Sequence, residues 1–311
     1  MKKSLHQVVI QKVRGATPLR IRQKIGPVIS FVLYVFNTRV RKNRKIPKVL
    51  PIKDTVDLIV KKKLSVIRFG DGEISLIDGL NLGFQKRDRE LSNKLEVILR
   101  TNKEGLLICI PGIWDRLENF KSYAYWFNMH HLYRYGHVWK NVLSYNAVYG
   151  DTNITRSYLA YVDRSDCNSI FKSIFSIWNA SDVILVEGEK SRLGVGNDMF
   201  NSVKSLKRIL CPPENAFEKY EEIKKEVLKN DKDKLILVSL GPTAKVLAYD
   251  LFLLNYRVVD IGHVDMEYEM FLRGETKQTK VEFKYFNEIN ERDPEECKDE
   301  KYLSQIIANI K

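Results

Sequence analysis

Two carboxylates flank a glycine in "SVIRFGDGEISLIDG", residues 65–79, directly after an apolar run. A plain turn needs the glycine but not a second acid. On an extended segment Asp71 and Glu73 point to the same side, and Gly72 lets the backbone turn tightly. Two hard oxygen ligands then face one Mg²⁺ or Mn²⁺, which typically takes one or two carboxylates together with substrate phosphates. The pattern predicts a divalent metal site. The alternative is a capped turn, because Asp favours turns and Glu favours the first helical turn.

A second acidic stretch is "DIGHVDMEYE", residues 260–269, in which Asp265, Glu267 and Glu269 alternate with other residues. If the stretch is extended, these three acids face one way and repel one another unless a cation, an arginine or water relieves them. A purely structural role is therefore less favoured for these three acids than for the other acids considered in the chain. His263 is either a metal ligand or a hydrogen-bonded core residue.

A third feature is the sequence Gly241-Pro242-Thr243, which follows the apolar run "LILVSL". A helix that starts just after a strand offers free N–H groups and a positive dipole end to an anion, and proline suits its first turn. The alternative is an ordinary strand-to-helix turn. Glu187 follows another apolar run, and the nearby Arg192 could hold a phosphate in a bidentate manner, although solvated arginines are commoner. The nearby "LGVGND" lacks the third glycine of a dinucleotide fingerprint.

The elements that must position these residues alternate between strands and helices. We expect strands at 65–69, 105–111, 181–189, 207–212, 234–240 and 256–263. We expect helices at 54–63, 89–100, 197–206, 214–230 and 241–255, with 116–145 helical in part. Strands that are apolar on both faces and alternate with helices indicate an α/β fold, a mainly parallel Rossmann-like sheet with helices on both faces. Ligands of such sheets bind at the carboxyl ends of the strands, where the residues above are found.

The charge is confined to one end of the chain. The net charge is +13, but residues 1–50 hold thirteen Lys or Arg and no acid, while the rest carries equal numbers of both signs. We therefore expect three parts: a basic arm at 1–50, a catalytic domain at 51–275 and a charged, irregular surface extension at 276–311. A nucleic-acid binder is an alternative for the arm, but the body shows no nucleic-acid module, so we expect no nucleic-acid partner.

Within the arm, "IGPVISFVLYVF" (residues 25–36) is apolar but shorter than the roughly 20 residues that span a bilayer. A helix lying on an anionic membrane surface fits this composition, and the alternative is a first helix packed on the body. The four cysteines are scattered without a C-x-x-C pair, which suits a reducing cytosol. The sequence thus predicts a cytoplasmic protein, peripheral on the inner face of the cell membrane.

Five stretches, in this order, resemble the GT-D-type glycosyltransferases of bacteria. They are "IRFGDGE", "GDTNITRSY", "VEGEKSRLGVGNDMF", "RILCPPENAFEKYEEI" and "GPTAKVLAYDLFLLNYRVVDIGHVDMEYE". Together they cover roughly residues 50–273 of this sequence. The resemblance implies transfer of a sugar from a nucleotide-diphosphate donor, UDP-linked, in cell-surface polysaccharide or glycoprotein assembly. The family's D-x-E motif, implicated in binding Mn²⁺ or Mg²⁺ and the donor, falls on Asp71 and Glu73.

Given this resemblance, we assign roles to the remaining residues as our own hypotheses. The metal and nearby cations would neutralise the charge that develops on the leaving diphosphate. We expect donor contacts from Arg68, Gly70, Glu187, Arg192, Gly241, Pro242 and Thr243. If the reaction inverts the anomeric centre, we expect one of Asp265, Glu267 and Glu269 to act as general base. Asp265 is the first choice because it is nearest the strand end. Thr155, Arg156 and Ser157 contact either the donor or the acceptor.

The expected acceptor is a glycan or lipid-linked glycan. A metal-dependent phosphohydrolase acting on nucleotide sugars is the main alternative, because it needs the same carboxylates and phosphate-binding groups. A non-catalytic scaffold is another, and it predicts no nucleotide binding.

Overall fold

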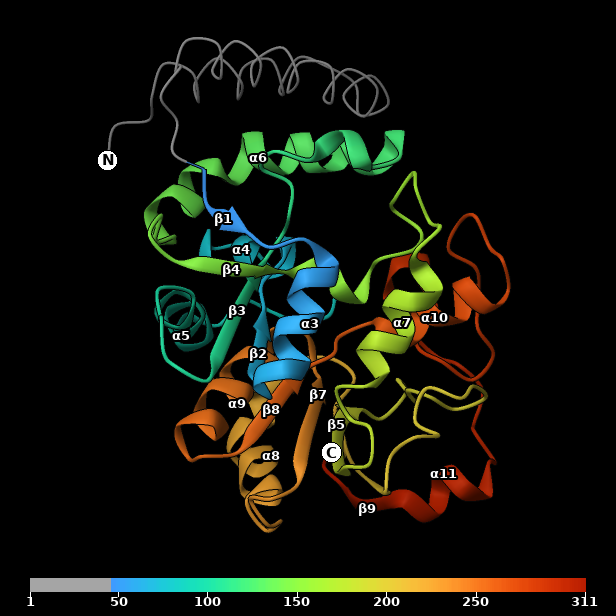
Figure 1. Cartoon of the computed structure of the whole chain (residues 1–311). Helices are drawn as coiled ribbons and strands as arrows, with labels where there is room; N and C mark the ends of the chain where they lie inside the picture. Colours follow the sequence, from blue (N-terminus) through green and yellow to red (C-terminus); the bar gives the residue numbers. More distant parts are fainter. Residues whose placement is uncertain (1–45) are drawn as a thin grey trace, which may run out of the picture.

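The computed structural model describes residues 46–311, in which nine strands form one sheet (Figure 1). The strand order is β1-β4-β3-β2-β8-β7-β5-β6-β9, and every neighbouring pair is parallel. The strands are β1 (Lys48–Val49), β2 (Ser65–Arg68), β3 (Leu106–Ile110), β4 (Val148–Asp151), β5 (Asp182–Gly188), β6 (Ser205–Cys211), β7 (Leu235–Ser239), β8 (Arg257–Asp260) and β9 (Ile306–Asn309). The prediction of a parallel α/β sheet is confirmed.

Helices cover both faces of this sheet. The α-helices are α3 (Ile52–Lys62), α4 (Asp71–Ile77), α5 (Arg89–Leu99), α6 (Ser122–Val142), α7 (Cys167–Phe175), α8 (Tyr220–Val227), α9 (Gly241–Leu253), α10 (Val264–Leu272) and α11 (Glu300–Gln305). Short 3₁₀ turns are η1 (Leu117–Asn119), η2 (Thr152–Thr155), η3 (Ala216–Lys219) and η4 (Asn287–Ile289). Figure 1 shows α3, α7 and α10 lying together, apart from α5, α8 and α9.

Alternation along the strands divides the core into two layers. In β2, Val66 belongs to the apolar cluster that includes residues of α3, α7 and α10, whereas Ile67 belongs to the cluster that includes residues of α4, α5, α8 and α9. Successive strand residues point to opposite faces, so each central strand must be apolar throughout. The runs "SVIR" and "LLICI" are buried along their whole length for this reason.

The two ends of the described chain differ from the predicted domain boundaries. Lys48 and Val49, assigned to the arm, form β1 and pair with β4. Residues 276–311, expected as a surface extension, pack into the domain: Val281 and Phe286 are buried, and β9 adds an outer strand beside β6. The catalytic domain therefore includes both segments. The rest of the arm, including 25–36, lies outside the described residues.

One predicted helix is absent from the structure. Residues 197–204 form turns, and β6 begins at Ser205. The apolar residues of this stretch do not make a helical stripe against the sheet. Met199 is instead buried beside Trp178, whose indole N–H donates to the Met199 carbonyl at 2.9 Å. Tertiary packing thus overrides the helical periodicity of the sequence.

Candidate functional site

The last residues of two neighbouring central strands form the base of the candidate site. Arg68 ends β2 and Asp260 ends β8, and their side chains form an ion pair of 3.0 Å with almost no exposure to solvent. The Arg68 Nε also donates to the Asp260 backbone carbonyl at 2.9 Å. Its Nη1 donates to the Thr155 hydroxyl and to the Thr152 carbonyl of η2. Three strand-end segments are therefore tied together by one guanidinium.

A glycine makes room for this arrangement. Gly262 has a φ of +41°, and a Cβ at that position would lie 1.8 Å from Arg68 Nη2. The close approach explains why the turn after β8 carries glycine at this position.

Lys245 extends the network to the D-x-E segment. Its Nζ lies 3.0 Å from Asp260 Oδ2 and 3.1 Å from Glu73 Oε1, and all three side chains are less than a tenth exposed. Burial acts to raise the pKa of Asp260, but the Arg68 and Lys245 cations outweigh it and hold the pKa below its usual value. Sequence analysis missed Lys245 and Asp260. Their signals were a lone lysine early in an apolar helix and an acid ending an apolar strand.

The D-x-E segment itself is helical rather than extended. Asp71 and Glu73 lie in the first turn of α4, where residues two apart point to different sides of the helix. Glu73 Oε2 accepts the Gly70 N–H at 2.8 Å in a capping box, so the capped-turn alternative describes Glu73 correctly. Asp71 is exposed, and its carboxylate makes no hydrogen bond or ion pair in the described part of the chain.

A second charged group lies at the same edge and includes a residue that sequence analysis did not single out. Arg156 forms an ion pair with Glu288 of η4, and His263 Nε2 lies 4.0 Å from the same carboxylate. The pKa of Arg156 is raised, because the attraction of acids that include Glu288 and Asp71 outweighs the effect of burial. Burial lowers the pKa of His263 despite Glu288. Glu288 belongs to the predicted extension, and nothing in its local sequence marks it.

The start of α9 lies beside this network. Gly241 has a φ of +52°, and a Cβ there would lie 2.8 Å from the Phe84 ring. Pro242 occupies the first turn, as expected. The Thr243 hydroxyl is buried and has no hydrogen-bond partner among residues 46–311. The unpaired hydroxyl and free N–H groups of this helix start are suited to an anion.

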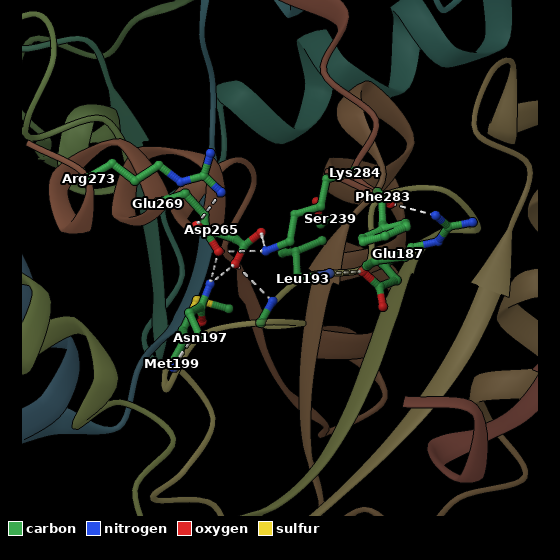
Figure 2. A network of polar contacts seen from close by, with 12 residues as sticks. Glu187, Leu193, Asn197, Met199, Ser239, Asp265, Glu269, Arg273, Phe283 and Lys284 are labelled. Atoms are coloured by element: carbon green, nitrogen blue, oxygen red, sulfur yellow. Dashed lines mark hydrogen bonds and ion pairs between the residues drawn. The ribbon is translucent and has the colours of Figure 1, made fainter. Parts of the chain in front are cut away.

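The acids of α10 are buried. The helix begins at Val264, so Asp265 and Glu269 share one face, and both contact Lys284 Nζ, at 2.8 and 3.1 Å (Figure 2). Asn197 donates to the same two carboxylates, at 2.8 and 2.7 Å. Asp265 is 1% exposed. This network joins α10 to the glycine loop after β5 and to the C-terminal segment.

Three further predicted site residues also have internal partners. Glu267 accepts the backbone N–H groups of Tyr158 and Leu159, at 2.9 and 2.6 Å. Glu187 is fully buried and pairs with Arg208, and Arg192 donates to the carbonyls of Phe283 and Glu295. These internal contacts argue against Asp265, Glu267 or Glu269 as general base and against Glu187 and Arg192 as donor ligands, because each group holds segments of the fold together.

The remaining predicted residues, Thr155, Arg156 and Ser157, differ in their burial and in their partners. Thr155 is buried and supports Arg68, whereas the side chain of Arg156 is 42% exposed. The Ser157 hydroxyl is buried without a partner in the described residues.

Residues 46–311 contain no group of three or more His, Cys, Asp or Glu side chains placed to hold a metal. A site with fewer protein ligands remains compatible with the chain, since Mg²⁺ is often bound by one or two carboxylates plus substrate phosphates. Asp71 is free to act as such a ligand. Glu73 uses two of the roughly four acceptor positions of a carboxylate, so it has room for a cation.

The sequence and structure were compared with known proteins. A sequence model of the family described as "Glycosyltransferase GT-D fold" matches residues 66–289. "Glycosyltransferase GlyD" of Streptococcus pneumoniae is 38% identical over 261 residues, which are 83% of this chain and 32% of that protein. "Probable glycosyl transferase Gly" of Streptococcus gordonii is 40% identical over 268 residues, 84% of this chain and 39% of that protein. The chain thus spans less than half the length of these relatives.

Solved structures agree with this match. One, titled "The highly conserved domain of unknown function 1792 has a distinct glycosyltransferase fold", is 36% identical with a TM-score of 0.83, covering 92% of this chain and all of that one. Another, "A New Glycosyltransferase (DUF1792) from Streptococcus sanguinis", is 38% identical with a TM-score of 0.81, covering 86% of this chain and all of that one.

Proposed function

Because the chain belongs to the family of GT-D-fold glycosyltransferases, we propose that it transfers a sugar from a UDP-linked donor to a glycan or lipid-linked glycan acceptor, with the help of a divalent metal. The acceptor would belong to cell-surface polysaccharide or glycoprotein assembly. The observation that carries this proposal is the convergence of Arg68, Lys245 and Arg156 on the strand ends beside the exposed Asp71.

These cations support binding of the donor diphosphate. Arg68 and Lys245 are held by Asp260, which fixes their positions before any ligand arrives. Charged groups that are already oriented stabilise a developing negative charge without reorganising during the reaction. As the bond between the sugar and the diphosphate breaks, its electron pair would stay on the diphosphate oxygen, which these groups and the start of α9 would face. The acceptor hydroxyl oxygen would form the new bond to the anomeric carbon and release its proton. We assign donor contacts to Arg68, Gly70, Arg156 and the Gly241–Thr243 turn.

The metal is proposed at the D-x-E segment with Asp71 as its first ligand; Glu73 points to another side of α4, so it would join the same ion only by reorienting its side chain. A bound divalent ion would supply further neutralisation of the diphosphate charge. Asp71 offers a free carboxylate, while Glu73 caps α4 and contacts Lys245. We propose His263, whose side chain is 40% exposed at the same edge, as an additional ligand.

Membrane association through the basic arm is also a proposal, and most of the arm lies outside the described residues. No helix within residues 46–311 is long and apolar enough to cross a membrane. Thirteen basic residues and an apolar stretch support binding of the arm to anionic lipid. Sedimentation with anionic vesicles tests this. The full chain should sediment with them, and a variant with neutral residues in place of the basic side chains at 1–45 should not.

The proposed function is tested with a panel of nucleotide sugars, Mn²⁺ and a lipid-linked glycan acceptor, with release of UDP as the readout. We expect slow release from one UDP sugar without acceptor, faster release with acceptor, and radiolabelled sugar in the product. Release of phosphate that is independent of acceptor would instead identify a phosphohydrolase. Absence of any nucleotide-sugar binding would support the scaffold alternative.

A further inference from the structure

The amino edge of the sheet, opposite the candidate active site, carries a second concentration of positive charge. A shallow cavity of about 620 Å³ opens there, with Lys63, Lys103 and Arg257 in its lining. Glu104 is the one acid in the lining. None of the three cations forms an ion pair within the described part of the chain. The lining therefore carries two positive charges in excess.

Arg257 is the unusual member of this group. Its Nε is buried and has no hydrogen-bond partner among residues 46–311, and its Nη1 donates to a single carbonyl, that of Ile177, at 3.3 Å. Burial lowers the pKa of this guanidinium. Arg257 is partly exposed and only its Nε is both buried and unpaired, so an anion in the cavity would supply an acceptor for this donor.

The fold explains part of the charge but not all of it. Lys63 is the C-cap residue of α3, where a cation complements the negative end of the helix dipole. The same reasoning does not apply to Arg257, which begins β8. Its unpaired Nε belongs to a residue of the sheet, so no helix end accounts for this positive charge.

The cavity also has an apolar wall. Phe252 and Tyr256 line it, and the Phe252 ring lies against Gly105, close enough that a Cβ there would be 3.4 Å away. Its volume is within the range of small-molecule sites. A ligand with a charged group and a flat apolar part would satisfy the cations and cover this wall.

From these observations we propose that the cavity at the amino edge binds a phosphate group carried on a small apolar or aromatic moiety. A phosphate monoester carries a charge of about −1.5 to −2 at neutral pH, which matches the excess charge of the lining. Its oxygens can also accept both from the Arg257 fork and from the two lysine ammonium groups. The site is separate from the donor site, because Ser65 in its lining and Arg68 lie at opposite ends of β2, about 10 Å apart.

Calorimetric titration of the full chain with phenyl phosphate and with inorganic phosphate tests the proposal. We expect saturable binding, tighter for phenyl phosphate because its ring covers the apolar wall. Arg257→Met and Lys103→Met should each weaken phenyl phosphate binding at least about tenfold, the loss expected for a hydrogen bond to a charged group. Lys103 is exposed, so its variant tests the site even if Arg257→Met folds poorly.

Lys280→Met, which removes an exposed lysine outside both sites, is the matched control and should bind phenyl phosphate as the unaltered chain does. Arg156→Met at the opposite edge reports any phosphate binding at the proposed donor site. The proposal is overturned if binding is not saturable, or if Arg156→Met abolishes it while Lys103→Met and Arg257→Met leave it intact. None of these measurements uses a nucleotide sugar or a metal. Their outcome is therefore independent of the proposed transferase activity.

Discussion

The ammonium of Lys245 lies 3.1 Å from the carboxylate of Glu73, which joins the helix after β7 to the helix after β2. The contact places a structural cation directly behind the D-x-E segment. Because Lys245 also contacts Asp260, a single side chain links the ends of three strands through buried charges.

Replacing this cation tests the network. Lys245→Met should lower the free energy of unfolding by roughly 3–5 kcal/mol, because it leaves Glu73 and Asp260 without one of their buried partners. Urea denaturation followed by circular dichroism measures the change. Lys229→Met, which removes a mostly exposed lysine paired with Glu226, should change stability by less than about 1 kcal/mol. Equal effects of the two substitutions would contradict the importance of the network.

The turn after β8 gives a second prediction. Gly262→Ala should reduce sugar transfer by at least about tenfold, because the new Cβ would displace the Arg68 guanidinium, for which we propose a contact with the donor. Gly274→Ala is the control: this glycine also has a positive φ, +66°, but nothing lies within 4 Å of the added Cβ. Both variants share backbone strain of about 1 kcal/mol. Only the first should lose activity, and retention of full activity by Gly262→Ala would contradict the role of Arg68.

The C-terminal segment is predicted to be part of the folded domain. Lys284→Met should destabilise the protein by roughly 3–5 kcal/mol, since it leaves the buried Asp265 and Glu269 carboxylates beside each other without their shared cation. Thermal unfolding measures this. Lys280→Met, four residues earlier and 56% exposed, should have almost no effect. If both variants melt with the unaltered chain, the segment does not stabilise the fold as described.

Glu288 predicts a pH dependence of stability. Burial acts to raise its pKa, but His263 and Arg156 outweigh burial and lower the pKa to about 2. The unfolded chain therefore binds more protons at acid pH, and the contribution of Glu288 is complete above its ordinary pKa and is lost as pH falls toward 2. It is on the order of 3 kcal/mol at neutral pH. Denaturant titrations should show a gap between the unaltered chain and Glu288→Gln at pH 7 that closes near pH 2. A gap independent of pH would contradict the ion-pair origin.

The central layers of the fold were predictable from sequence because burial on both faces imposes continuous apolar runs. "SVIRF" and "KLILVSL" could not be anything but interior strands in an α/β chain. The edge strands β1 and β9 have only two and four residues and one covered side, so their sequences carry little signal. The order of the strands depends on contacts between distant segments, which no local pattern encodes.

The site residues were predictable only where a side chain suited to the chemistry also stands at the end of a predicted strand. Arg68, Asp71 and the Gly241 turn stand at strand ends, so topology brings them to one edge. For Asp265 and Glu269 the assumed extended geometry was wrong, because the helix begins directly after the turn at Gly262. Glu288 lies far from Arg156 in the sequence, so only the tertiary fold brings the two side chains together.

The most direct measurement is calorimetric binding of UDP with and without Mn²⁺, for the unaltered chain and for Asp71→Asn. Mn²⁺ should tighten UDP binding to the unaltered chain at least about tenfold, and Asp71→Asn should remove that gain without loss of stability, since the side chain is exposed and its proposed role is to ligate the metal. Asp231→Asn, on the exposed turn before β7, should retain the full gain. If Asp71→Asn binds UDP with an undiminished Mn²⁺ effect, the metal site is not at the carboxylates beside Gly72.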